Sequence, residues 1–267
     1  MVSPKFRALT LRFFTGRECY KGSDHPFGVA VPEEKPIPGR ISAPAMLYLL
    51  MKREFLIERR TLGWAGSMGI LALQCVVLAG LGFSRETLND AKLSMSSAAL
   101  WLIFLFSGSV GMNRAFAQEV DGGALSGLLT LPFERSLLYI AKALSGMIFL
   151  AVALVVMLLA AGVFMGLPIA GVWGELSIVF ALTSFGYVAV GTLVASMTAS
   201  RRGRDALLAI ALLPLVVPLF LAATGATRKL MQGAELSALQ SELTMLGAFG
   251  AIYFAIGLIS FERVVES

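Results

Sequence analysis

Charged residues are scarce in this chain, and their scarcity indicates its class. Only 15% of the 267 residues are charged, whereas 57% are hydrophobic. Soluble domains carry about 25% charged residues. Apolar runs of nearly twenty residues recur, and about twenty helical residues cross a hydrocarbon core of about 30 Å. We therefore expect a polytopic membrane protein, and we interpret the net charge of +5 as a signal of membrane orientation rather than of nucleic-acid binding.

Residue types that commonly bind metal or haem, histidine and cysteine, are also few. The single histidine, His25, lies in a proline-rich N-terminal segment, so we expect no axial haem ligation by histidine inside a helical bundle. Cys19 and Cys75 fit no metal or haem-attachment spacing. A disulfide between them is not expected either, because Cys75 lies within an apolar run. The sequence therefore predicts no metal site and no directly bound cofactor.

A phosphate-binding loop is missing as well. No lysine follows a glycine, so the chain contains no G-x-x-x-x-G-K-[ST] motif for binding ATP. The apolar runs also contain no Asp, Glu, Lys, Arg or His, which argues against a proton relay or a voltage sensor. We expect that the chain is not an enzyme. If it moves a substrate uphill, the energy must come from another subunit.

Uncharged stretches of sufficient length define the expected spans. A helix satisfies its own backbone hydrogen bonds in lipid, so an all-α bundle of six transmembrane helices is predicted. Pro168 is expected to mark the exit of the third stretch, which is longer than one span requires. The stretches are Ala65–Ser84, Leu93–Asn113, Ala143–Gly174, Leu176–Ser200, Ala206–Thr227 and Leu243–Phe261.

Basic residues near the span ends predict the orientation. Lys and Arg accumulate on the cytoplasmic side of membrane proteins. The side that carries most of them is marked by Lys52, Arg53, Arg59, Arg60, Arg114, Arg135, Lys142, Arg201, Arg202 and Arg204. The opposite side has only Arg85, Lys92, Arg228 and Lys229. Both termini are therefore predicted to be cytoplasmic.

The N-terminal part divides into two regions of different composition. Residues 1–45 are rich in proline and lack sustained periodicity, which predicts a disordered tail or a mis-annotated extension with Met46 or Met51 as the true start. An arginine-containing presequence is the remaining alternative.

Residues 46–267 are predicted to form the transmembrane domain. It opens with an amphipathic interfacial helix over residues 46–62, in which Leu47, Leu50, Met51 and Phe55 share a face. A simple basic flank is the alternative.

The stretch FAQEVDGGALSGLLTLP, residues 116–132, stands between the second and third spans. Its apolar residues fit short helical turns that Gly122 and Gly123 separate, Asp121 can cap the second piece, and Pro132 ends it. A pure connector could be much shorter. We therefore predict a small cytoplasmic helix that contacts a soluble partner, with a structural loop as the alternative.

Proline and small residues inside the spans suggest bending and packing. Pro214 and Pro218 stand one turn apart in LLPLVVPLF, and each removes a backbone donor, so a kinked or loosened helix is predicted, with gating as a possible role. The pair Gly162 and Gly166, and the series Gly247, Ala251 and Ala255, have the four-residue spacing of close helix packing.

Three segments of the chain resemble the haem exporter protein B family (CcmB). They are ALWLIFLFSGSVGMNRAFAQEVDGGALSGLLTLP, YIAKAL and ASRRGRDALLAIALLPLVVPLFLAA, and the similarity covers about Lys52 to Glu262. The matching residues are Trp101, Arg114, Phe116, Gly123, Leu125, Pro132, Lys142, Pro214 and Pro218. The chain departs from the family pattern at Asn113, at Asp121 and Gly122, and in a first span without proline.

The resemblance implies a type II ABC exporter permease in the bacterial inner membrane. Such a subunit serves haem delivery to periplasmic c-type cytochromes, with a separate ATPase subunit, a haem-handling membrane protein, a haem chaperone and a second permease copy or related subunit as partners. Haem would be cargo, and ATP would bind the partner. The residues implied to couple to the ATPase are Arg114, Phe116, Glu119, Asp121, Gly123, Leu125, Leu128, Pro132 and Lys142.

Other functions stay open at the level of sequence. A type II ABC permease for a drug, lipid or polysaccharide would share the same spans, and so would a non-transporting scaffold of a haem-loading complex. The sequence also leaves open whether haem crosses through this chain or whether ATP drives release of the chaperone.

Overall fold

The protein is a helical bundle in a computed structural model that describes residues 43–61, 64–83, 89–121, 135–169, 171–198 and 204–266. All regular structure in these ranges is helical. The α-helices are α2 (Ala43–Thr61), α3 (Trp64–Phe83), α4 (Asp90–Asp121), α6 (Arg135–Met165), α7 (Trp173–Thr198), α8 (Arg204–Met231) and α9 (Gln240–Glu266), with a short 3-10 helix, η1 (Leu236–Leu239), before α9. Six of the described helices, α3 to α9, are long and apolar enough to cross a membrane, which confirms the predicted six-span all-α fold.

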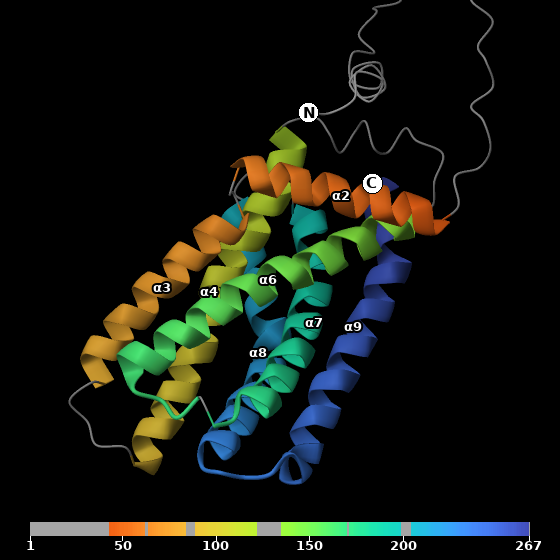
Figure 1. Cartoon of the computed structure of the whole chain (residues 1–267). Helices are drawn as coiled ribbons and strands as arrows, with labels where there is room; N and C mark the ends of the chain where they lie inside the picture. The colour runs from red at the N-terminus through yellow and green to blue at the C-terminus, as the bar shows by residue number, and fades with distance from the viewer. Residues whose placement is uncertain are drawn as a thin grey trace, which may run out of the picture. The chain divides into compact units, whose positions relative to one another are not determined.

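The central helix of the bundle is α7. It packs against α4, α6, α8 and α9, and most of its span is buried. On one side of α7, α3 packs against α4 and α6, whereas α9 lies on the other side (Figure 1). Helix α8 packs against α4, α7 and α9. The span in α3 and the span in α9 are the least buried of the six. The bundle is therefore built around α7, with α3 and α9 at its margins.

Aromatic residues from three helices form the middle of the core. The Trp101 ring of α4 stacks on Phe180 of α7 with a centroid distance of 4.5 Å, and it contacts Phe220 of α8 at 5.8 Å. The Trp101 Nε1–H donates a hydrogen bond of 3.0 Å to the Thr227 hydroxyl, so the indole has a partner inside an apolar bundle. Together these contacts hold α4, α7 and α8 in register.

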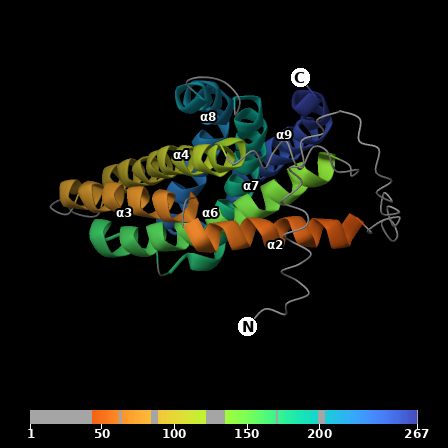
Figure 2. The same ribbon diagram turned by 90° about the horizontal axis from the view of Figure 1, so that it is seen from above.

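Helix α2 is a separate element that crosses the end of the bundle where α9 ends, at a steep angle to the spans (Figure 1). Seen from above, it runs beside α6 (Figure 2). Leu50 is buried against Leu138 and Tyr139 of α6, and Leu258 of α9 packs on the same cluster. The predicted apolar face of this helix is thus largely covered by the protein. Beyond its first turn, the described side chains that it exposes are Tyr48, Leu49, Lys52, Leu56 and Arg59, a mixed apolar and basic set that suits a membrane interface.

The third span differs from its predicted boundaries at both ends. Helix α6 begins at Arg135 rather than Ala143 and therefore includes Lys142, which is buried. It ends at Met165, three residues before Pro168, where Gly166 adopts a left-handed φ of 64°. The charge of Lys142 hid the true start of the helix in the sequence, because that charge has a partner only in the folded protein.

The predicted small-residue packing sites were wrong in detail. A Cβ at Gly162 would meet Ile169 only at an ordinary 3.9 Å, and one at Gly166 or Gly247 would meet nothing within 4 Å. Ala251 and Ala255 are exposed. Close helix approaches on α9 instead occur at Gly250, where a Cβ would lie 2.5 Å from the Phe185 ring of α7, and at Gly257, where a Cβ would collide with the Tyr139 side chain of α6.

Candidate coupling site

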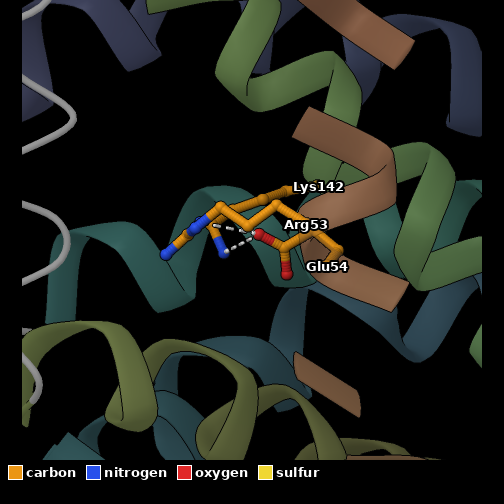
Figure 3. A network of polar contacts seen from close by, with 3 residues as sticks. All are labelled: Arg53, Glu54 and Lys142. Carbon is orange, nitrogen blue, oxygen red and sulfur yellow. Dashed lines mark hydrogen bonds and ion pairs between the residues drawn. The ribbon is translucent and has the colours of Figure 1, made fainter. Parts of the chain in front are cut away.

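A buried lysine joins α2 to the beginning of α6. Lys142 is 5% exposed, and its Nζ lies 3.8 Å from Oε1 of Glu54 on α2. The same carboxylate oxygen accepts a hydrogen bond of 3.1 Å from Nη1 of Arg53 (Figure 3). Two cations thus converge on one carboxylate from different helices, and this polar contact fixes α2 relative to α6.

Apolar contacts support this ion pair on both sides. The Phe55 ring of α2 lies 5.1 Å from the Phe149 ring of α6, and Leu50 is buried one turn before Glu54. The surrounding side chains keep most water away from Lys142, so its attraction to Glu54 is screened less than that of a surface pair. The site is therefore a desolvated joint between a surface helix and a spanning helix.

A second carboxylate of α2 binds the beginning of the first span, α3. Oε1 of Glu58 accepts a hydrogen bond of 2.7 Å from the backbone N–H of Ala65 in the first turn of α3. This carboxylate thus satisfies a donor that has no partner within its own helix, and its charge complements the positive end of the helix dipole. Glu54 and Glu58 hold α2 to two spans, α6 and α3 respectively.

The structure places the predicted coupling residues as follows. Arg114 is exposed on α4, and Lys142 is buried on α6. Phe116, Glu119 and Asp121 belong to the final turns of α4, which runs without interruption to Asp121. Their side chains, and the whole of Gly123, Leu125, Leu128 and Pro132, lie outside the described residues. Residues 116–121 therefore extend the second span and do not form a separate helix.

The length of α4 explains this extension. Its 32 residues reach about 48 Å at 1.5 Å per residue, well beyond a hydrocarbon core of about 30 Å. The candidate span within α4 ends at Arg114, so the last turns of the helix, up to Asp121, extend beyond that span. The segment 122–134 then leads to Arg135, the first residue of α6.

Both predicted bending residues lie inside α8, which passes through Pro214 and Pro218 as one helix. Pro214 is exposed and Pro218 is partly buried. The far end of α8 is well anchored: Thr227 bonds Trp101, and Lys229 Nζ lies 2.6 Å from Glu242 of α9. A gating role for the two prolines stays a prediction.

Sequence reasoning missed Glu54 and Glu58. It interpreted α2 through its basic residues, as a positively charged flank. A signal was available, because two acids spaced one turn apart follow the apolar residues of an amphipathic helix. Their partners, however, lie on other helices and cannot be identified from spacing.

The class of protein is now defined: a polytopic α-helical membrane protein of six spans, with a surface helix tied by carboxylates to its first and third spans. The sequence pattern of the CcmB protein family matches residues 45–266, which include nearly all of the described helices. The chain belongs to the CcmB family.

Two relatives that carry the name heme exporter protein B agree with this assignment. A protein of Rhodobacter capsulatus named heme exporter protein B is 28% identical over 193 residues, covering 72% of this chain and 86% of the relative. A protein of the same name from Pseudomonas aeruginosa is 25% identical over 220 residues, covering 78% of this chain and 97% of the relative.

Proposed function

We propose that this chain is the membrane permease subunit of an ABC transporter that serves haem delivery for c-type cytochrome biogenesis. The observation that supports the proposal best is the CcmB family match, which extends over the helical unit from residue 45 to residue 266. The two relatives named heme exporter protein B support the haem cargo. The protein would lie in the bacterial inner membrane with both termini in the cytoplasm.

ATP hydrolysis belongs, in this proposal, to a separate subunit. The sequence has no phosphate-binding loop, so the permease must receive mechanical work through contact. The support for the contact region is the end of α4 that extends beyond its span, with Glu119 and Asp121, together with the segment that follows it. A force applied to this region would be transmitted to the second span through α4, and to the third span through α6, which begins at Arg135.

The joint at Lys142 gives this coupling a second route. The pair of Lys142 and Glu54 links the start of α6 to α2, and Glu58 links α2 to the start of α3. A displacement of α6 would therefore move α2 and, through it, α3. In this proposal the surface helix coordinates the first and third spans when the ATPase acts.

The test is deletion of the gene in its host, scored by covalent haem staining of c-type cytochromes in membranes. We expect loss of staining and recovery on expression of the intact chain. A variant that inserts normally but changes an exposed residue, such as Val163→Leu, serves as the control for expression. Normal staining in the deletion strain would exclude the proposal and favour a permease for another cargo.

A further inference from the structure

The charges of the surface helix α2 are sorted between its two faces. Its two acids, Glu54 and Glu58, both have partners in the protein: the first binds Lys142 of α6, and the second binds the start of α3 (Figure 3). Two of its basic residues, Lys52 and Arg59, are exposed instead. The outward face of α2 therefore carries positive charge, while the acids of the helix are turned toward the bundle.

Apolar residues share this outward face with the two cations. The face consists of Tyr48, Leu49, Lys52, Leu56 and Arg59. Each apolar residue in it stands three or four positions from a cation, which is the spacing of neighbours on one side of a helix. Tyr48 is 64% exposed and Leu56 is 50% exposed, so a large apolar area is left uncovered by the described chain. Such a face fits the boundary between lipid head groups and hydrocarbon, where long basic side chains can reach phosphates.

The neighbouring helix α6 indicates where this face lies. Exposed apolar residues recur along its span at helical spacing: Leu144, Ile148, Val152, Val155 and Leu159. This side of α6 suits contact with lipid chains. Helix α2 contacts α6 at Leu138 and Lys142, in the first two turns of the span Ser136–Met165. Seen from above, α2 runs beside α6 at the margin of the bundle (Figure 2). The outward face of α2 is therefore placed at the level where the third span begins, next to surrounding lipid.

We infer that the outward face of α2 binds the head groups of anionic phospholipids. The Lys52 ammonium and the Arg59 guanidinium donate charge-assisted hydrogen bonds to lipid phosphates. Tyr48, Leu49 and Leu56 enter the boundary with the acyl chains. A zwitterionic lipid carries its own cation beside the phosphate, so the face prefers lipids with net negative charge. Each basic residue near an anionic surface strengthens such binding about five-fold.

This binding has a consequence for the bundle, which goes beyond an interfacial position for α2. Glu54 holds α2 to α6, and Glu58 holds it to α3. A lipid that fixes the outward face of α2 therefore also stabilises the arrangement of the first and third spans. In this way the charge of the surrounding lipid acts on the permease as a ligand does, whatever cargo the permease serves.

Fluorescence quenching by brominated lipids tests the preference. The full chain is expressed with Cys19→Ser and Cys75→Ser, and a single cysteine that replaces Leu49 or Leu56 carries a fluorophore. The protein is placed in nanodiscs of phosphatidylglycerol and phosphatidylcholine with identical chains, and each lipid is brominated in turn, so that the two quenching values give the relative affinity beside the label. We expect phosphatidylglycerol to bind about three-fold more tightly, or better, at both positions, and the preference to fall at high salt. A label at Leu102, exposed within the span of α4, should report a ratio of about one.

Charge variants assign the preference to the two cations. Lys52→Gln with Arg59→Gln should lower the ratio at Leu56 to about one. The exchange Lys52→Arg with Arg59→Lys keeps both charges and should keep the ratio. Arg228→Gln is the matched control, because it removes an exposed cation from the last turn of α8, at the opposite end of the bundle from α2; it should leave the ratio unchanged.

Three results would overturn the inference: equal affinity for the two lipids at Leu49 and Leu56, a preference that survives the loss of both cations, or loss of quenching by both lipids when the ATPase subunit is added. The last result would show that a protein covers the face. The nanodiscs carry the same lipids in both leaflets and contain no haem, so the outcome is independent of the haem-staining test. Failure of one test therefore leaves the other standing.

Discussion

At the scale of single residues, the buried ion pair between Lys142 and Glu54 is asymmetric. Glu54 has a second cation, Arg53, at 3.1 Å, whereas the Lys142 side chain is only 4% exposed and depends on the protein for charge compensation. Removing one partner of a buried pair costs more when the charge left behind is the less solvated one. The pair therefore stabilises the position of Lys142 more than that of Glu54.

Substitution of the two partners should reveal this asymmetry. We expect Glu54→Gln to destabilise the protein by about 1–3 kcal/mol, because Lys142 keeps its charge and loses a nearby anion. Lys142→Met should cost less, since methionine retains the apolar stem and Glu54 keeps Arg53. The measurement is the thermal unfolding midpoint of detergent-solubilised fluorescent fusions. A larger loss for Lys142→Met would contradict this account.

Two glycines on α9 offer a second test at this scale. A Cβ at Gly250 would lie 2.5 Å from the Phe185 ring and 3.4 Å from the backbone of Gly186, while Gly247 has open space. Gly250→Ala should therefore destabilise by about 1–3 kcal/mol through overpacking. Gly247→Ala should be neutral or stabilise by up to about 1 kcal/mol, because alanine favours the helix. Equal unfolding midpoints for the two variants would show that α7 and α9 do not approach closely at Gly250.

At the scale of elements, α8 combines an anchored end with a weakened middle. Thr227 and Lys229 fix one end to α4 and α9 through side-chain bonds. Pro214 and Pro218 each remove a backbone hydrogen bond in the middle part of the helix. A helix with this construction bends most easily at the prolines, so the half before Pro214 is the part expected to move.

Replacing both prolines of α8 should raise the stability of the protein and lower its function. We expect Pro214→Ala with Pro218→Ala to raise the unfolding midpoint, because two backbone donors return to the helix, while covalent haem attachment falls several-fold. The control is Ile210→Ala with Leu221→Ala, which changes two exposed residues of the same helix. Haem attachment that equals the control would remove the gating role.

At the scale of the whole molecule, the second and third spans are adjacent in the sequence and both contact α7. Helix α4 ends at Asp121 and α6 begins at Arg135, so residues 122–134 connect the two helices in the sequence. A partner that binds this segment could therefore act on α7 through both α4 and α6, since α7 packs against each.

Changes within residues 116–132 should uncouple the proposed ATPase subunit from the permease and leave the bundle intact. We expect Gly123→Leu to insert normally but to abolish haem attachment, because a side chain there would block a turn or a close approach. Glu119→Lys should weaken capture of the ATPase, and more at low salt than at high salt, if its partner is basic. Pull-down of the ATPase and haem staining are compared at matched membrane levels. Full capture and staining in both variants would identify the segment as a connector only.

The sequence by itself determined the class of fold. The number of spans follows from the length of uncharged runs, because each helix satisfies its own backbone in lipid independently of its neighbours. The amphipathic pattern over residues 46–62 likewise predicted the helix that the structure places at Ala43–Thr61, and the resemblance in three segments, among them FAQEVDGGALSGLLTLP, led to the family. The coupling residues of that stretch stay predictions, since their side chains lie outside the described part of the chain.

The tertiary structure alone decided which faces meet. In a chain that is 57% hydrophobic, the inward and lipid-facing sides of a span are equally apolar, so periodicity cannot distinguish Gly250 from Gly247. Nor could spacing reveal that Lys142 is compensated by Glu54, because the two lie far apart in the sequence and meet only when α2 packs on α6.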